Sequence, residues 1–268
     1  MIKKLTQKDN EEVMEYLKQE PEFNLFIIGD IEAFGYETDF QQIWAEYDHG
    51  KVVAVLLQYR GNLVYYSDED RSVEPFIEIM NDLKFEILNG KKEAIQRFEP
   101  YLKSWNIKDM YFASMRSFTK ENIDTANVKI IDSYDLFCDE WELLTQIEEF
   151  SSGGRGKKEE YSKHAFKTSQ EGFKTTYYLS VDNKMVSVAS TVAECSVNAM
   201  IIGVATLEEH RKKGHASVLM NKLCDDYLNG KEKSLCLFYD NPKAGKIYQR
   251  LGFENIGMYR MYDKKKTK

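Results

Sequence analysis

The sequence predicts a mixed α/β (α+β) fold of two similar halves, each a mixed, mainly antiparallel twisted sheet flanked by helices. Short apolar runs typical of strands are interspersed with segments whose apolar residues recur every three or four positions, as in helices. The 268 residues suffice for two ordinary domains. One order of elements occurs twice, namely a turn, two strands, a helix, a short strand and another helix.

The first half is expected to open with a strand and two helices, followed by a hairpin-like series of strands. Turn residues at 48–51 and 60–62 separate three of these strands. Leu25, Ile28 and Ile31 fall on one helical face, which predicts a helix there. The expected strands are residues 1–5, 43–47, 52–59, 63–67, 85–88 and 109–115. The expected helices lie around residues 13–17 and 25–31 and over residues 73–83 and 91–102.

A polar segment, residues 117–127, separates the two halves and has no periodic apolar face. We therefore predict an N-terminal domain over residues 1–125 and a C-terminal domain over residues 129–268. Sequence identity between the halves is slight, so the repeat is inferred from the pattern of elements.

The second half is expected to repeat this arrangement. Leu219, Leu223 and Tyr227 are four positions apart, so their helix should pack on the sheet. The expected strands are residues 128–137, 174–181, 185–194, 198–206, 234–239 and 254–262. The expected helices are residues 138–150, 159–169, 214–228 and 242–251. The glycine-rich loop 151–158 is either a flexible linker or a mobile lid over a substrate.

The most informative stretch is residues 198–217, where an apolar strand leads into a basic glycine loop and then a helix. The loop reads Arg211-Lys212-Lys213-Gly214-His215-Ala216. Gly214 lets the main chain approach a ligand closely, and the loop and helix N-terminus present N–H groups and positive charge to an anion. The alternative is an ordinary turn with solvated basic residues. Gly203 predicts either a bulge in the strand or close packing by a neighbouring side chain.

Further residues follow this loop along the chain. They are Asn241, Tyr248 and the run Leu251-Gly252-Phe253. Together with Arg211-x-x-Gly214-x-Ala216, this pattern resembles the GNAT superfamily of acetyl-CoA-dependent N-acyltransferases over about residues 174–262. The tandem arrangement also resembles two-domain members of the superfamily, here with a degenerate N-terminal copy. The resemblance implies acetyl-CoA as the acyl donor, an amine as the acceptor and no metal.

The resemblance assigns the loop and strand to the cofactor. The pyrophosphate of coenzyme A would be bound by Arg211, Lys212, Lys213, Gly214, His215 and Ala216. The strand before the loop would splay from residues 234–239, so that the main chain of Val204, Ala205 and Thr206 binds the pantetheine arm and the thioester. An N–H group there would also stabilise the oxyanion that forms during transfer.

The resemblance also implies roles for two residues near the C-terminus. The amide of Asn241 would bind the pantetheine, whereas the alternative is a purely capping role before Pro242. The Tyr248 hydroxyl would be the general acid that protonates the departing thiolate, and its alternative is a buried aromatic side chain.

Among the acidic residues, Glu194 is our candidate for the general base, because it lies near the end of the strand before the cofactor strand. Its alternative is a solvent-facing charge, and Glu208 and Glu209 are weaker candidates. In the first half, the segment corresponding to the basic loop is residues 68–75, which is acidic and lacks glycine. We therefore expect one acetyl-CoA site per chain.

The composition narrows the class of partner. A net charge of −7 argues against a nucleic-acid partner. The longest apolar run, residues 199–205, is too short to span a bilayer, so we expect a cytoplasmic protein with no membrane partner. The four cysteines show no CxxC pair and the four histidines are scattered. The acceptor is expected to be a small-molecule or peptide amine, and a homodimer is compatible with the sequence. The rival functions are an acyl-CoA-binding regulatory module without turnover and a nucleotide-binding domain.

Overall fold

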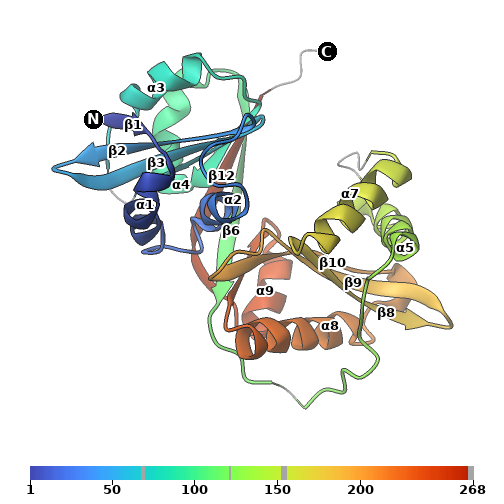
Figure 1. Cartoon of the computed structure of the whole chain (residues 1–268). Coiled ribbons are helices and arrows are strands. Elements are labelled where there is room, and N and C mark those ends of the chain that lie inside the picture. Colours follow the sequence, from blue (N-terminus) through green and yellow to red (C-terminus); the bar gives the residue numbers. More distant parts are fainter. Residues whose placement is uncertain (68–69, 121, 152–155, 265–268) are drawn as a thin grey trace. The chain divides into compact units, whose positions relative to one another are not determined.

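The computed structural model describes residues 1–67, 70–120, 122–151 and 156–264 (Figure 1). By packing, the chain forms two compact units. The first is Met1–Ser114 together with Phe238–Lys268, and the second is Met115–Leu237. Each unit contains a mainly antiparallel sheet flanked by helices, which confirms the predicted fold class. The predicted domain limits at 125 and 129 come from the repeat along the chain and stay a prediction. Packing is a different criterion, and it groups the last 31 residues with the first unit.

The first unit is built on one sheet. Its strands are β1 (Ile2–Lys4), β2 (Gln41–Asp48), β3 (Lys51–Tyr59), β4 (Asn62–Tyr66), β5 (Ile87–Lys91), β6 (Trp105–Met115) and β12 (Glu254–Lys264). They lie in the order β1-β2-β3-β4-β5-β12-β6. Only β4 and β5 pair in parallel. The predicted turn at 48–51 joins β2 to β3 with His49 and Gly50 both at positive φ, as a two-residue hairpin requires.

Helices cover both faces of this sheet. They are α1 (Asn10–Leu17), α2 (Leu25–Phe34), α3 (Glu74–Asn81) and α4 (Lys92–Ile95), with short 3-10 turns at Gln7–Asp9 and Gln96–Tyr101. The helix α9 (Pro242–Arg250) follows β11 along the chain and also groups with the first unit. Figure 1 shows α1 and α3 on opposite sides of β2 and β3. The aromatic rings of Phe76 and Phe98 pack edge-on against Tyr65, at centroid distances of 5.2 and 5.0 Å. These contacts anchor α3 and the 3-10 turn at Gln96–Tyr101 on the sheet.

The strand β12 completes the first unit from the far end of the chain. It pairs antiparallel with β5 on one side and with β6 on the other. Arg260 in β12 forms a bidentate ion pair with its register partner Asp109 in β6, at 2.6 and 2.9 Å. Tyr259 donates a hydrogen bond to the side chain of Asn89, 170 residues earlier. The sheet of the first unit therefore depends on residues that follow the whole second unit.

The second unit has a shorter sheet. Its strands are β7 (Lys129–Ile130), β8 (Lys174–Val181), β9 (Lys184–Val192), β10 (Asn198–Thr206) and β11 (Ser234–Tyr239), whose last two residues group with the first unit. Their order is β11-β10-β9-β8-β7, and only β10 and β11 are parallel.

Helices lie on both faces of the second sheet as well. They are α5 (Tyr134–Thr145), α6 (Glu148–Ser151), α7 (Lys158–Gln170) and α8 (His215–Cys224), with a 3-10 turn at Glu208–His210 and a π-helical extension at Asp225–Gly230. Figure 1 shows α5 and α7 on one face and α8 on the other. Leu219, Leu223 and Tyr227 are buried, as predicted. Within the predicted loop 151–158, residues 152–155 lie outside the described residues.

One element of the second unit differs from its prediction. We expected a strand over residues 128–137, but only β7 is extended and α5 already begins at Tyr134. The reason is local, because the Ser133 hydroxyl accepts a hydrogen bond from the Leu136 N–H and caps the helix. Phe137 and Leu144 are then buried together on the helix face that packs against β9. None of the described helices is long and apolar enough to cross a membrane.

Candidate functional site

The strand β10 contains the bulge that Gly203 predicted. Ile202 pairs with Ser190 of β9 and Ala205 pairs with Val188, so two residues of β10 face a single residue of β9. Gly203 has a φ of +63°, a conformation that side chains with a Cβ rarely adopt. The bulge turns the main chain of β10 away from regular pairing and leaves Ile202 42% exposed.

On its other side, β10 separates from β11. The parallel ladder covers three pairs, which are Asn198 with Ser234, Ala199 with Leu235, and Met200 with Cys236. Within the described part of the second unit, β10 forms no further pair with β11 and continues to Thr206. The edge of β10 after Met200 therefore has no strand partner on this side within the described part of the second unit, as the splayed strand in the resemblance requires.

The three strand residues assigned to the cofactor lie along this open segment. Val204 is half-buried within the bulge and Ala205 is buried. The Ser187 hydroxyl donates to the Ala205 carbonyl at 3.0 Å, and the Arg211 Nε donates to the Thr206 carbonyl at 3.2 Å. These bonds hold the end of the strand in place on the β9 side and at the loop.

The basic loop follows the 3-10 turn at Glu208–His210. Lys212 and Gly214 both have positive φ, at 62° and 85°, and α8 begins directly after Gly214. Within the described residues, the main-chain N–H groups from Lys212 to Ser217 have no hydrogen-bond partner. These six consecutive donors lie at a helix end that carries roughly half a positive charge. The segment has the form of an anion site.

The side chains of the loop differ in role. Arg211 is directed back to the Thr206 carbonyl, and its guanidinium also lies 3.7 Å from the Glu149 carboxylate. In the described chain, Lys212 and Lys213 form no ion pair, and both are exposed. Arg211 therefore holds the loop on the strand, while the two lysines remain available to a ligand.

His215 and Ala216 occupy the first turn of α8 and are half-buried. The pKa of His215 is lowered by desolvation and by the positive charges of His210 and Lys213. The lowered pKa favours the neutral imidazole, and its Nε2 is buried with no partner among the described residues. It contributes a polar atom to the loop and no full charge.

Several partners hold the carboxylate of Glu194, and its role as a general base stays a prediction. Glu194 lies in the turn between β9 and β10, at the opposite end of β10 from the basic loop. Lys233 and Lys231 pair with its carboxylate at 2.8 and 3.0 Å, and the Tyr227 hydroxyl donates to it at 2.8 Å. Burial alone would raise the pKa, but hydrogen bonds from Lys233, Tyr227 and Lys231 outweigh it and lower the pKa. Donors occupy both carboxylate oxygens of Glu194, so a proton could be added only by displacing one of them.

Asn241 and Tyr248 belong to the part of the chain that groups with the first unit. The Asn241 carbonyl accepts from the Gly245 N–H at 3.1 Å, so Asn241 precedes α9 with Pro242 as the first helical residue, as predicted. Tyr248 is half-buried between the rings of Tyr239 and Phe253. Burial raises the pKa of its hydroxyl. Its proposed role and that of Asn241 stay predictions.

The sequence analysis missed a buried polar cluster behind the bulge. It contains Glu140, Lys174, Thr176 and Ser190. The available signal was the position of Lys174, which alternates with Thr176 and Tyr178 on the inward face of β8. In the described residues, there is no group of three or more His, Cys, Asp or Glu side chains that could hold a metal.

Comparisons with known proteins agree with this geometry. The family model described as GNAT acetyltransferase matches residues 76–262. A solved protein from Drosophila is 10% identical, covers 98% of both chains and superposes with a TM-score of 0.69. A GCN5-related N-acetyltransferase from Sphaerobacter thermophilus is 12% identical over 98% of this chain and 95% of its own, with a TM-score of 0.58.

A third solved structure has two copies of the fold. It is described as a tandem GNAT protein from the clavulanic acid biosynthesis pathway, is 11% identical, covers 100% of this chain and 99% of its own, and has a TM-score of 0.57. At these identities, the three structures show a shared fold. No curated protein matches the sequence.

Proposed function

The chain belongs to the GNAT acetyltransferase family, and from this premise we propose that it transfers an acetyl group from acetyl-CoA to an acceptor amine by direct attack. The observation that carries the proposal is the row of six unpartnered N–H groups from Lys212 to Ser217, which follows the bulged and splayed strand β10. The pyrophosphate of coenzyme A is an anion of suitable size for that row, and Lys212 and Lys213 add positive charge.

The pantetheine arm is proposed to lie along the open edge of β10. The main chain of Val204, Ala205 and Thr206 would bind it, together with the amide of Asn241. Acetyl-CoA supplies an acetyl group already activated as a thioester. An N–H group at the bulge would stabilise the negative charge that develops on the carbonyl oxygen during attack.

Tyr248 is proposed as the general acid. Its raised pKa keeps the hydroxyl protonated at neutral pH, so it can donate a proton to the departing thiolate sulfur. Among the described residues, no hydrogen bond occupies that hydroxyl. In Tyr248→Phe, kcat should fall by about 10²–10⁴-fold while the affinity for acetyl-CoA is retained. An unchanged kcat would remove Tyr248 from the mechanism.

The proposal is tested by binding and turnover. Acetyl-CoA should raise the melting temperature, whereas ATP at the same concentration should not. Lys212→Glu with Lys213→Glu should abolish the shift, and Lys163→Glu with Lys103→Glu serves as a control of equal charge change at exposed positions. Release of coenzyme A is then measured with a panel of amines comprising polyamines, amino acids, aminoglycosides and peptides. A larger shift with ATP would overturn the proposal.

A second function is an acyl-CoA-binding regulatory module without turnover. The ion pairs that hold Glu194 favour it, because they withdraw the acidic residue that the sequence offered as a base. The same assays separate the two functions. Binding of acetyl-CoA without turnover of any amine in the panel would select the regulatory module.

A further inference from the structure

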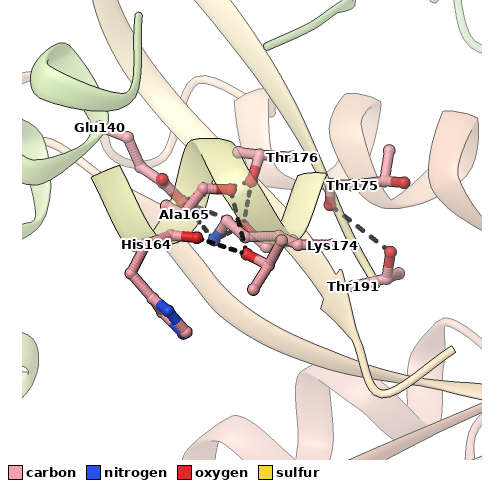
Figure 2. Close-up of polar contacts among 9 residues, drawn as sticks. Glu140, His164, Ala165, Lys174, Thr175, Thr176 and Thr191 are labelled. Carbon is pink, nitrogen blue, oxygen red and sulfur yellow. Dashed lines mark hydrogen bonds and ion pairs between the residues drawn. The ribbon is translucent and has the colours of Figure 1, made fainter. Parts of the chain in front are cut away.

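The polar cluster behind the β10 bulge connects a helix to two strands (Figure 2). We refer to Glu140, Lys174, Thr176 and Ser190 as the Glu140 cluster. The Glu140 Oε1 atom accepts hydrogen bonds from Lys174 at 3.1 Å, from Ser190 at 3.2 Å and from Thr176 at 3.4 Å. The hydroxyls of Thr176 and Ser190 are 2.8 Å apart. One carboxylate oxygen of α5 therefore receives three donors from β8 and β9.

The second carboxylate oxygen has no such partner. Glu140 is 1% exposed, and its Oε2 atom is buried with no hydrogen-bond partner among the described residues. A charged oxygen that is buried without a donor is costly in free energy, and protonation of the carboxyl group lowers that cost. The Oε2 atom is therefore the position in this cluster where a proton can be added without displacing a donor.

Ser190 brings the Glu140 cluster to the bulge. It is the register partner of Ile202, directly before Gly203. A Cβ atom built on Gly203 would lie 4.0 Å from the Ser190 Oγ atom, and the space around it holds no other non-adjacent atom within 4 Å. The Ser190 hydroxyl is therefore the polar side-chain group next to the open bulge, and behind it lies a buried carboxylate.

From this arrangement we propose that Ser190 and Glu140 accept the proton that the acceptor amine must lose before it attacks the thioester. The inference rests on the proposed function, since it concerns the same reaction. Ser190 would be the catalytic residue that touches the acceptor. Glu140 would act through Ser190, and this pair would replace Glu194 in the role of base.

The proton transfer balances as follows. An N–H bond of the acceptor ammonium breaks and its proton joins the Ser190 Oγ atom, while the electron pair stays on nitrogen. The original Ser190 O–H bond breaks and that proton joins the Glu140 carboxylate. Glu140 becomes a neutral carboxylic acid and the amine becomes nucleophilic. After the product leaves, the proton returns through Ser190 to solvent.

The charged and titratable groups around Glu140 are few. From β8, Lys174 faces the carboxylate, and its ammonium group also lies 5.8 Å from the Phe137 ring and 6.0 Å from the Tyr161 ring of α7. His164 of α7 contributes only its carbonyl to a bond in this region, and its imidazole points away from the cluster (Figure 2).

Ser190→Ala tests the relay with a small change. At pH 7, kcat for the panel amine with the highest turnover should fall by about 10²–10⁴-fold, while the affinity for acetyl-CoA is retained. The deficit should shrink by about tenfold for each unit that the pH is raised toward the pKa of the amine, because a neutral amine needs no proton acceptor. The matched control is Thr191→Val, which removes the hydroxyl of the next residue on the other face of β9 and should remain close to wild type.

A second variant removes the carboxylate without leaving a lone buried charge. Glu140→Gln combined with Lys174→Met should reproduce the pH-dependent deficit of Ser190→Ala. A full rate in Ser190→Ala, or a deficit that is the same at every pH, would overturn the relay and leave the proposed function intact. If the wild type binds acetyl-CoA but turns over no amine, the proposed function fails and the relay fails with it.

Discussion

At the scale of single residues, Glu194 shows how distant partners decide the role of a carboxylate. Its side chain is 14% exposed and is held by lysines 37 and 39 residues further along the chain. The sequence places Glu194 correctly at a strand end, but neither lysine is close enough along the chain to predict the pairing. The general-base interpretation rests on position alone and stays a prediction, whereas the ion pairs point to a structural role.

This reading predicts that Glu194→Gln affects stability more than catalysis. The free energy of unfolding at pH 7 should fall by about 1–3 kcal/mol, because Lys231 and Lys233, whose side chains are 40% and 21% exposed, lose their counter-charge. Because the pKa of Glu194 is lowered in the folded protein, its ionised form stabilises the fold. This stabilisation is fully present above the ordinary pKa of a carboxyl group and is lost as the pH falls through the pKa of the folded protein. Urea titrations at pH 7 and at acidic pH measure this, with exposed Glu171→Gln as control. A collapse of kcat with unchanged stability would restore Glu194 as a base.

Asp109 gives a second residue-scale prediction. Hydrogen bonds from Arg260 and then Lys92 outweigh burial and lower the pKa of Asp109 to about 2. Its stabilisation of the fold is therefore present above about pH 4 and is lost as the pH falls toward 2. Asp109→Asn should cost about 2 kcal/mol at neutral pH, and less as the pH approaches 2. Urea midpoints across this range test it against exposed Asp263→Asn, and a pH-independent loss would contradict the ion-pair account.

At the scale of elements, the loop and α8 depend on one backbone conformation. Gly214 has a φ of 85° and no atom crowds its Cβ position, so strain alone should penalise a side chain there. Gly214→Ala should lower the free energy of unfolding by about 1 kcal/mol and weaken acetyl-CoA binding by shifting the N–H row. Gly230→Ala, at the other end of the same helical segment and without positive φ, is the control. If the two variants bind acetyl-CoA with equal affinity, the backbone conformation at Gly214 does not contribute to binding.

Elements were predictable where the signal is local. Helices α2 and α8 follow from apolar periodicity, and the β2–β3 hairpin and the bulge at Gly203 follow from turn residues and glycine. The start of α5 was not predicted, because an apolar run hides the Ser133 cap inside it. The Glu140 cluster was missed because its four members come from three separate elements, and only packing brings them together.

At the scale of the whole molecule, the two halves differ in the residues that follow their corresponding strands β4 and β10. In the first unit, the segment after β4 corresponds to the basic loop that follows β10 in the second unit. There Arg71 pairs with Asp48 at 3.1 Å and Arg97 pairs with Asp70 at 2.8 Å. The helix that follows begins with Glu74, which opposes an anion at its N-terminus. Residues 68–69 of the acidic segment lie outside the described residues.

We therefore expect one acetyl-CoA per chain by isothermal titration calorimetry. Lys212→Glu with Lys213→Glu should reduce the stoichiometry from one to zero. Two sites in the wild type, with one retained in this variant, would show that the first half also binds the cofactor.

The placement of β12 makes a prediction for the whole chain. A chain that ends at residue 253 should lose the first unit, because β5 and β6 would each lose their partner along the ladder. Hydrogen exchange should then show lost protection in β5 and β6, with protection retained in β8 and β9. A chain that ends at residue 264 is the control. Retained protection in β5 would show that the first sheet closes without β12.

The same strand sets an order for folding during synthesis. The ribosome makes β5 and β6 early, yet their shared neighbour emerges only after the entire second unit, a delay on the order of 10 s at ordinary translation rates. During that interval, two unpaired strand edges of the first unit are exposed to other chains. The second unit can therefore be completed before the first, which is the reverse of the usual N-to-C order. Its nascent form should be a client for chaperones that bind open strand edges.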